Sequence, residues 1–428
     1  MQKIHLKAPQ NWINDPNGFI YYKGKYHLFY QCFPFAPMWG RMHWGHAVSL
    51  DLVTWEHLGI ALYPTKTNDR SGCFSGSAVE SDGNMHLFYT GVNYDEENPE
   101  NINLSNRSLT AAQMKITSAD GFSFDNIKDK KTVIEPIADE NIGSKADTRD
   151  PKVWRGRDAW YMILGSTANN IGRFLFYKST DLENWTYVNS FSKENMGRIW
   201  ECPDYFEVGG TGIVLFSPIG ILTDGVAYDA AAVYALASFD GQTCTMEFKS
   251  DYSLLDYGMD LYAPQSTVDK DGRRVLVAWA RMPEAADGKW NGMMSLPRVV
   301  ETDGNHVYFR PHPNIKAAFS EKIEKPCAKD GYLIKTNLKN GENLSIGGYK
   351  TRRENDRILT DRTAVFVKGN VRYTAQTPVI KEGCALDIYV DSHLIEIFVN
   401  DGEYVLSGVV YSLTDEIIGE NYALYAAK

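Results

Sequence analysis

Three short acidic motifs in the sequence combine carboxylates with backbone constraints that hold them in place. They are Asn14-Asp15-Pro16, Arg149-Asp150-Pro151 and Trp200-Glu201-Cys202-Pro203. A proline close after an acid restricts the backbone around it, so the direction of the carboxylate is held. Two carboxylates that act as nucleophile and general acid, with a third that binds sugar hydroxyl groups, are the equipment of a retaining glycosidase. Three unrelated structural acids are the alternative interpretation.

The surroundings of Glu201 and Asp15 predict different roles for these two carboxyl groups. Glu201 lies between Trp200 and Cys202, so desolvation is expected to raise its pKa and to suit it to general acid catalysis at neutral pH. Asp15 lies in a sequence that predicts a chain-reversing turn, where Asn14 and nearby backbone amides can donate hydrogen bonds to it. These bonds favour the charged form, so we expect Asp15 to be ionised and nucleophilic.

A repeat along the chain indicates how the elements that carry these acids are arranged. Short β-prone segments bounded by Gly, Asp and Asn predict an all-β chain, and a Ser-x-Asp turn recurs in it at spacings of 69, 61 and 59 residues. The turns begin at Ser49, Ser118, Ser179 and Ser238, and apolar segments occupy residues 26–30, 85–89, 160–164, 212–216 and 275–279. Units of this length predict a five-bladed β-propeller, with unrelated hairpins of a sandwich as the alternative. Closure of a propeller would bring the three acids to one axial pocket.

The pattern changes after Pro297, which predicts a second domain. We expect a propeller domain over residues 1–311, a linker with a short Pro-started helix over 312–325, and a β-sandwich over 326–428. Segments 364–367, 385–390 and 394–399 alternate apolar and polar residues, as strands do, and Asn400-Asp401-Gly402 predicts a hairpin.

Composition limits the possible partners of this chain of 428 residues. Its net charge of −10 argues against nucleic acid or an anionic membrane as the main partner, because no basic excess is present to neutralise phosphates. The six cysteines form no C-x-x-C pair and no zinc-type spacing, so we expect reduced thiols and neither a metal nor another cofactor. The sequence shows no signal peptide and no membrane-spanning run, which predicts a cytoplasmic protein. The oligomeric state stays open.

Several sequence blocks, in order along nearly the whole chain, carry a resemblance to a known family. They are residues 12–18 (WINDPNG), 29–31 (FYQ), 39–40 (WG), 43–46 (HWGH), 74–77 (FSGS), 89–91 (YTG), 149–151 (RDP) and 201–204 (ECPD). On these blocks the chain resembles glycoside hydrolase family 32, which comprises β-fructofuranosidases such as invertases, sucrose-6-phosphate hydrolases and fructan hydrolases. The resemblance implies retaining chemistry without a metal, on a five-bladed propeller followed by a sandwich. It implies that Asp15 is the nucleophile, Asp150 the transition-state stabiliser and Glu201 the acid/base.

The resemblance also implies which residues bind the substrate, a fructose-containing saccharide such as sucrose, sucrose 6-phosphate or a short fructo-oligosaccharide. The implied pocket residues are Asn14, Gln31, Trp39, Phe74, Ser75, Arg149, Asp260 and Trp279. Polar side chains of these types orient furanose hydroxyl groups, and the aromatic ones cover the apolar face of the ring. Core packing is the alternative for the three aromatic residues. A fructosyltransferase with the same three acids, or a catalytically silent sugar-binding propeller, is the alternative function.

Two features bear on substrate choice. Cys32-Phe33-Pro34 stands where the family often has Tyr-Asn-Pro, so the outer rim of the pocket departs from the family pattern. Arg41, Lys66 and Arg70 are candidates to meet a 6-phosphate, although exposed basic residues are usually solvated surface.

Overall fold

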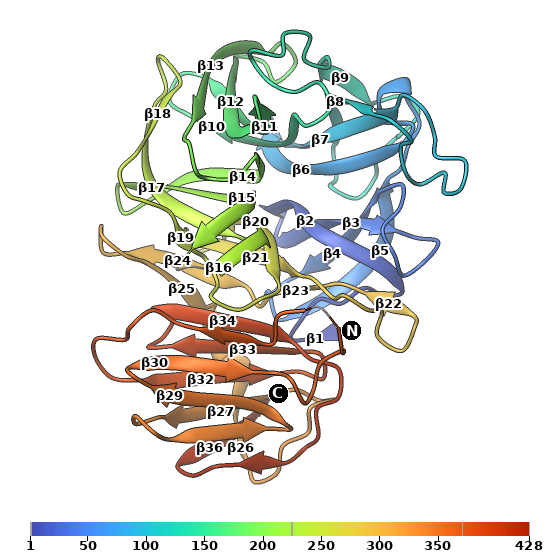
Figure 1. Ribbon diagram of the computed structural model, residues 1–428. Helices are drawn as coiled ribbons and strands as arrows, with labels where there is room; N and C mark the ends of the chain where they lie inside the picture. The colour runs from blue at the N-terminus through green and yellow to red at the C-terminus, as the bar shows by residue number, and fades with distance from the viewer. Residues whose placement is uncertain (1, 224–225, 370, 428) are drawn as a thin grey trace.

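The computed structural model describes residues 2–223, 226–369 and 371–427, and this part of the chain is nearly all β-structure. It contains one α-helix, α1 (Pro313–Ala318), and one short 3₁₀ turn (Thr67–Asp69). No helix in the described ranges has the length and apolarity needed to cross a bilayer. Figure 1 shows the sheets in two groups, with the earlier part of the chain above and the later part below.

The first group contains five sheets in the described part of residues 2–311. The first sheet consists of β1 (Gln2–Lys3), β2 (Asn11–Tyr22), β3 (Lys25–Phe33), β4 (His43–Ser49), β5 (Thr54–Leu62) and β22 (Trp290–Asn291). The second consists of β6 (Gly72–Ser81), β7 (Asn84–Tyr94), β8 (Leu109–Ser118) and β9 (Lys131–Ile134). The third consists of β10 (Arg149–Arg155), β11 (Trp160–Ala168), β12 (Ile171–Ser179) and β13 (Thr186–Ser192).

The fourth and fifth sheets complete this group. The fourth consists of β14 (Ile199–Val208), β15 (Thr211–Thr223), β16 (Val226–Ala230), β17 (Val233–Asp240), β18 (Thr245–Phe248) and β19 (Ser253–Leu254). The fifth consists of β20 (Leu261–Val268), β21 (Arg274–Ala280), β23 (Met293–Met294), β24 (Arg298–Thr302) and β25 (Val307–Pro311). The strands β2, β6, β10, β14 and β20 contact one another in this order, and β20 also contacts β2. They therefore form a closed inner ring.

The repeated Ser-x-Asp turn has the same structural place in successive sheets. After β4, the Ser49 hydroxyl donates to Asp51 Oδ1 at 3.0 Å, and the same oxygen accepts from the amides of Val53 and Thr54. The equivalent pairs after β8 and β12 are Ser118 with Asp120 at 2.9 Å and Ser179 with Asp181 at 3.0 Å. Each turn leads to the next strand of its sheet, which is β5, β9 or β13, so the repeat in the sequence corresponds to the sheets in space.

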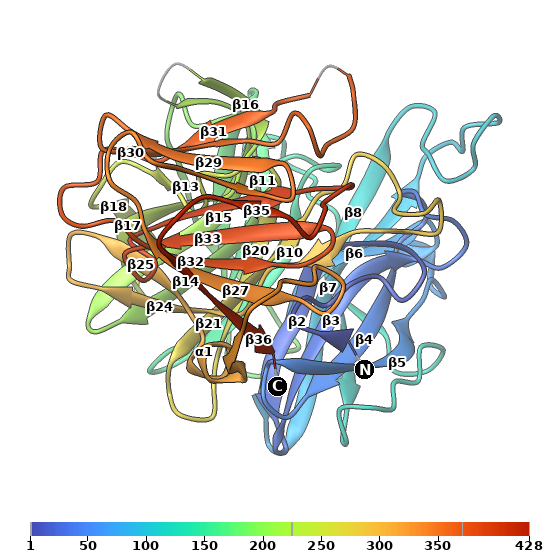
Figure 2. The same cartoon turned by 90° about the horizontal axis from the view of Figure 1, so that it is seen from below.

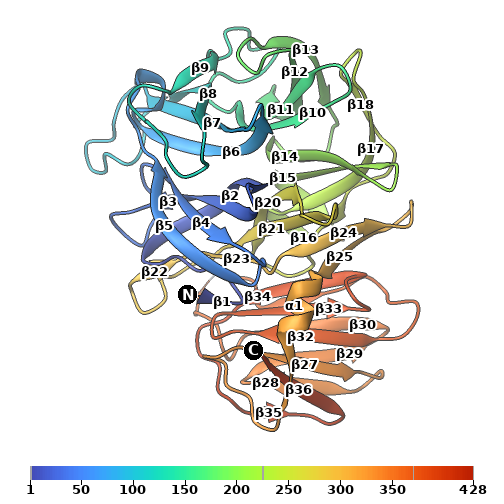
Figure 3. The same cartoon turned by 180° about the vertical axis from the view of Figure 1, so that it is seen from behind.

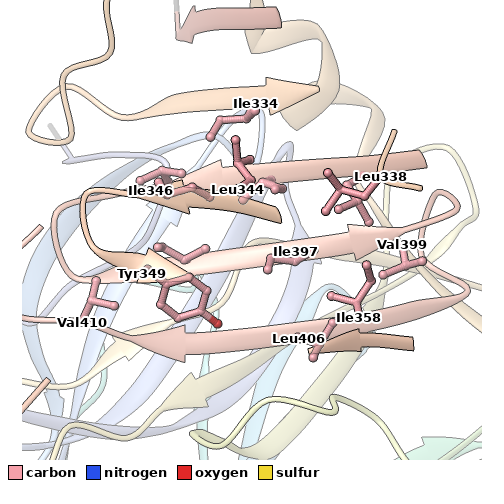
Figure 4. Packing of buried hydrophobic residues seen from close by; sticks show 14 of the residues in the cluster. Ile334, Leu338, Leu344, Ile346, Tyr349, Ile358, Ile397, Val399, Leu406 and Val410 are labelled. Atoms are coloured by element: carbon pink, nitrogen blue, oxygen red, sulfur yellow. The ribbon is translucent and has the colours of Figure 1, made fainter. Parts of the chain in front are cut away.

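The second group contains two sheets that pack face to face. One sheet consists of β26 (Phe319–Ile323), β36 (Tyr422–Ala427), β27 (Tyr332–Asn337), β32 (Ala385–Val390), β33 (Leu394–Val399) and β34 (Tyr404–Val409). The other sheet consists of β28 (Asn343–Ile346), β29 (Tyr349–Glu354), β30 (Arg357–Asp361), β31 (Thr374–Gln376) and β35 (Ile417–Ile418). Buried side chains from both sheets, among them Ile334, Leu344 and Ile397, form the core between them (Figure 4). Helix α1 leads from β25 to this group (Figure 3).

Two predictions about this later region differ from the structure. Strand β26 lies inside the predicted linker and already pairs with β36. Residues 364–367, predicted as a strand, form a turn in which the Val365 amide donates to the Arg362 carbonyl at 2.9 Å. Their apolar pattern has another cause, because Val365 and Phe366 are buried and the Arg362 guanidinium stacks 3.5 Å from the Phe366 ring centre. The hairpin at Asn400-Asp401 is confirmed by φ angles of 47° and 56° between β33 and β34.

Buried charges join the two groups of sheets. Arg298 of β24 is fully buried and lies 2.6 Å from Glu396 of β33 and 2.9 Å from Asp256. His5 Nε2 lies 3.0 Å from the other Glu396 oxygen. Removal of one member of such a buried network leaves its partners charged and desolvated.

Arg298→Met is therefore expected to lower the free energy of unfolding by about 3–5 kcal/mol. Arg310→Met is the matched control, because its partners Glu301 and Asp401 are exposed and a surface pair contributes about 1 kcal/mol or less. Urea denaturation of both variants measures the difference. Equal losses in the two variants would show that the buried network does not join the groups.

Candidate active site

Asp15 lies within strand β2, and the predicted chain reversal at this place is wrong. The pairing of β2 with β3 shifts register between Ile13 and Pro16 and again between Asn17 and Ile20. A β-bulge accommodates an extra residue and turns its side chain without reversing the chain. The proline and glycine that suggest a turn therefore mark a distorted strand.

The same distortion occurs in all five inner strands at an equivalent place. Register shifts fall between Cys73 and Gly76 in β6, Arg149 and Lys152 in β10, Glu201 and Asp204 in β14, and Tyr262 and Gln265 in β20. Three non-glycine residues at these bulges have positive φ, namely Asp150 at 63°, Cys202 at 49° and Ala263 at 51°. Left-handed backbone at such residues carries strain that the surrounding structure must hold. The bulges aim the side chains of five strands into one site.

A buried polar layer holds the inner strands together beside the bulges. The Gln265 side-chain amide donates to the carbonyls of Pro16 at 3.2 Å and Gly76 at 3.0 Å, and so joins β20 to β2 and β6. Lys152 of β10 lies 2.9 Å from Asp204 of β14 and donates to the Ser266 carbonyl of β20 at 2.7 Å. These contacts give the site a rigid base.

Asp15 and Asp150 meet at Cys202. The Cys202 sulfur lies 3.7 Å from Asp15 Oδ2 and 3.5 Å from Asp150 Oδ2, and the Cys202 amide donates to the same Asp150 oxygen at 2.8 Å. The Ser75 hydroxyl donates to Asp15 Oδ2 at 2.6 Å. The structure therefore brings together two acids that are 135 residues apart in the sequence.

Glu201 precedes Cys202 and completes the group of three acids. The Tyr262 hydroxyl donates to Glu201 Oε2 at 2.5 Å, and Arg149 Nη1 lies 3.7 Å from Glu201 Oε1. The Arg149 guanidinium pairs with Asp147 through Nη2 and with Glu201 through Nη1, while the Cys202 amide donates a hydrogen bond to Asp150. Asp15 and Asp150 thus share Cys202, whereas the Glu201 carboxylate contacts Tyr262 and Arg149.

Burial dominates the electrostatics of the three acids. It raises the pKa of Glu201, against the charge of Arg149 and the hydrogen bond from Tyr262. Burial and the neighbouring charge of Glu201 raise the pKa of Asp150 to about 7. Three desolvated carboxyls at one point cannot all ionise without mutual repulsion, so the group retains a proton more readily than isolated acids do.

The electrostatic prediction for Asp15 needs correction. Burial raises the pKa of Asp15, and hydrogen bonds from Ser75 and Asn14 oppose this shift without reversing it. The sequence indicates Asn14 as a donor, but it does not show the depth at which the bulge places the carboxyl. The raised pKa of Glu201 agrees with its prediction, in direction and in cause.

Tyr262→Phe is expected to raise the pKa of Glu201, because it removes a hydrogen bond that favours the charged carboxylate. A general acid must be protonated, so activity falls as the pH rises through its pKa. The alkaline limb of kcat/KM against pH should therefore move to higher pH in this variant. A purely structural role for Tyr262 would lower the whole profile without moving that limb.

Most of the predicted binding residues lie around the three acids. Ser75 bonds Asp15, and the Gln31 amide donates to Ser75 and lies 3.5 Å from Asp15. The Phe74 ring packs against Trp39 edge to face and lies 5.8 Å from the Arg149 guanidinium.

Asn14 and Trp279 belong to the same surroundings through Trp12. The Trp12 indole donates to Asn14 Oδ1 at 2.8 Å, and its ring contacts Trp279 with centroids 5.8 Å apart. Both indoles are only partly buried, so their rings can offer an apolar surface to a sugar.

Asp260 is not joined to this group by any contact of the described residues. Both of its carboxylate oxygens bond the Arg362 guanidinium, and one accepts from the Val409 amide at 2.7 Å. Asp260 is 6% exposed, so its carboxylate is saturated inside the protein. The predicted sugar contact through this carboxylate is therefore replaced by a buried ion pair with the later group of sheets.

Comparison with known proteins follows the same division of the chain. Residues 5–311 match the description "Glycosyl hydrolases family 32 N-terminal domain", and residues 314–422 match "Glycosyl hydrolases family 32 C terminal". The chain belongs to glycosyl hydrolase family 32. It is accordingly a glycoside hydrolase, and the three acids lie in the part that matches the family's N-terminal domain.

Relatives of this family 32 enzyme match it over nearly its whole length. A sucrose-6-phosphate hydrolase of Zymomonas mobilis is 35% identical over 98% of this chain and 89% of its own, and a raffinose invertase of Escherichia coli is 33% identical over 99% and 91%. Among solved structures, the Bombyx mori β-fructofuranosidase superposes with a TM-score of 0.85 at 29% identity, over 99% of this chain and 93% of its own.

The structure adds two residues that the sequence did not single out in this family 32 site. Tyr262 bonds Glu201, and Cys202 contacts both aspartates. Each had a signal in the sequence, because Cys202 follows Glu201 directly and Tyr262 lies two residues after Asp260. Within the described ranges, no group of three or more His, Cys, Asp or Glu is placed to hold a metal ion.

Proposed function

We propose that this enzyme is a retaining β-fructofuranosidase that releases terminal β-D-fructofuranosyl residues from sucrose, sucrose 6-phosphate or short fructo-oligosaccharides. The meeting of Asp15 and Asp150 at Cys202, one residue from Glu201, is the observation that carries the proposal. The names of the relatives, sucrose-6-phosphate hydrolase and raffinose invertase, support the substrate class. So does the solved complex of a mutant Bombyx mori relative with sucrose.

In the proposed mechanism, Asp15 attacks the anomeric carbon of the fructosyl unit while the bond to the leaving oxygen breaks. Glu201, whose pKa burial raises, donates its proton to that oxygen. Water then attacks the fructosyl-enzyme ester, Glu201 takes a proton from the water, and the Asp15 carboxylate is released. Asp150 accepts hydrogen bonds from fructose hydroxyl groups and stabilises the oxocarbenium-like transition state.

The surrounding side chains fit the binding of a furanose ring. Ser75 and Gln31 hold the carboxylate of Asp15 in position, since both approach its Oδ2 atom. The Phe74 and Trp39 rings pack edge to face, with the Arg149 guanidinium 5.8 Å from the Phe74 ring centre, and offer an apolar surface to the sugar. We propose that these groups, with Asn14, Arg149 and Trp279, form the fructose pocket.

We also propose that the five sheets of the first group are the blades of one five-bladed β-propeller, and that the two later sheets form a β-sandwich. The cyclic contacts of β2, β6, β10, β14 and β20 support the propeller. The position of β26 moves the proposed start of the sandwich from residue 326 to residue 319.

Substrate preference is tested by initial rates on sucrose, sucrose 6-phosphate, a short inulin-type oligomer and levan, with analysis of the products. All three candidate phosphate contacts already have partners: Arg41 pairs with Glu97, Lys66 donates to the Ile127 carbonyl, and Arg70 donates to the Tyr94 carbonyl at 3.5 Å. Release of glucose, or its 6-phosphate, and fructose in equal amounts supports a hydrolase. Longer fructosyl products at the expense of free fructose would support the transferase instead, and no turnover of any substrate would contradict both.

A further inference from the structure

A cavity of about 470 Å³ lies between the two groups of sheets and away from the three acids, none of which lines it. One wall is the outer face of β29, β30 and β31, and the opposite wall includes Tyr228 of β16 and Tyr257. Figure 2 shows β16 beside β31 at one edge of the molecule. A volume of this size is in the range of small-molecule sites.

The sheet wall of this cavity is strongly cationic. Lys350 and Arg352 are two residues apart on β29 and so share one face, Arg357 begins β30, and Arg372 precedes β31. Asp361, the cross-strand neighbour of Lys350, is the acid of the lining. Four cations against one acid are unusual at one place in a protein whose net charge is −10.

The arginines are held in place by contacts that leave other N–H groups unused, and Arg352 Nη2 pairs with Glu354 at 3.2 Å. Arg357 Nη1 donates to the Thr377 carbonyl at 2.7 Å, and Arg372 Nε donates to the Thr374 carbonyl at 3.0 Å. The Arg372 guanidinium also lies 4.9 Å from the ring centre of Tyr228. These contacts fix the direction of each guanidinium at low cost in side-chain entropy when a ligand binds.

Lys350 makes no side-chain hydrogen bond or ion pair among residues 2–223, 226–369 and 371–427, and the carboxylate of its cross-strand neighbour Asp361 attracts it. Its ammonium is therefore available to a ligand, while neighbouring cations repel it. An anion that accepts several hydrogen bonds would relieve this repulsion and use the free donors. Phosphate does so best, because its oxygens match both the guanidinium fork and the ammonium point charge.

We propose that this cavity binds a small phosphate-bearing molecule of the size of a sugar phosphate. The phosphate is held by Lys350, Arg352 and Arg357, and the remainder of the ligand lies toward Tyr228. The ligand touches both groups of sheets, so its binding stabilises their association and raises the melting temperature with concentration. The site is independent of the roles assigned to the three acids.

Calorimetric titration of the full-length protein with inorganic phosphate, glucose 6-phosphate, fructose 6-phosphate and glucose tests this. We expect inorganic phosphate and both sugar phosphates to bind in this cavity, and glucose not to bind there. If the ligand uses the whole cavity, the sugar phosphates should bind more tightly than inorganic phosphate. Saturating fructose, which occupies the proposed catalytic pocket, should leave the binding unchanged. Absence of binding by every phosphate compound, or displacement by fructose, would overturn the proposal.

Variants locate the site. Lys350→Met with Arg357→Gln should weaken the Kd for the bound phosphate by about 10-fold or more, as loss of charge-assisted hydrogen bonds does. Lys322→Met on the exposed face of β26 is the control and should leave the Kd unchanged, and sucrose turnover should be normal in the double variant and in the control. Lys350→Met alone keeps the test valid if the double variant is unstable, since this side chain has no hydrogen bond to lose and only the attraction of the half-exposed Asp361. An unchanged Kd in the Lys350 variant would place the phosphate elsewhere.

Discussion

Asp15→Asn is expected to lower kcat on sucrose by about 10³-fold or more, which is the scale seen when a covalent nucleophile is removed. Asparagine has nearly the same shape as aspartate and can keep the contact with Ser75, so the site should remain intact. Its amide cannot form the fructosyl ester, so the first chemical step is lost. Steady-state kinetics over a range of sucrose concentrations separates this effect on kcat from one on KM.

Asp158→Asn is the matched control for this variant, because Asp158 is an exposed acid outside the group of three. Its kcat should stay close to that of the wild-type protein, and neither variant should melt at a lower temperature than the wild-type protein. A kcat for Asp15→Asn within about 10-fold of the wild-type value would refute the role assigned to Asp15.

Glu201→Gln is expected to lower kcat on sucrose by about 10²–10⁴-fold, the usual contribution of a positioned general acid. Glutamine can keep the contact with Tyr262 but has no proton to give to the leaving oxygen. The leaving group of an aryl fructoside needs no protonation, so the rate of the first step on this substrate should fall much less in the variant than the rate on sucrose. The initial burst of released phenol measures that step directly.

The same variant should change the pH profile. Burial raises the pKa of Glu201, so the protonated acid persists to higher pH and activity falls as the pH rises through that pKa. Glu201→Gln should therefore lose the alkaline limb of kcat/KM. If that limb remained in place in the variant, another group would be the acid.

The arrangement of the sheets could be predicted because the sequence repeats a local contact. Ser49 and Asp51 cap their turn within a few residues, and the same pair recurs after β8 and β12. Such contacts depend on nearest neighbours, so the sequence displays them directly. The boundary at β26 was missed because its partner, β36, is about a hundred residues away.

The identity of the acids could also be predicted, but not their exact surroundings. Pro16 and Gly18 serve equally in a reversing turn and in a bulged strand, and only pairing with β3 decides between them. The raised pKa of Asp15 depends on burial by other strands. The carboxylate of Asp260 is taken by Arg362, which lies 102 residues further along the chain.

Trapping of the fructosyl-enzyme tests the central claim most directly. In Glu201→Gln with an aryl fructoside, the first step proceeds and hydrolysis of the ester lacks its general base, so the intermediate should accumulate. Acid quench, proteolysis and mass spectrometry should then find one fructosyl unit on the peptide that contains Asp15. Release of phenol with that peptide unmodified, or with the sugar on another residue, would contradict the assignment of Asp15 as the nucleophile.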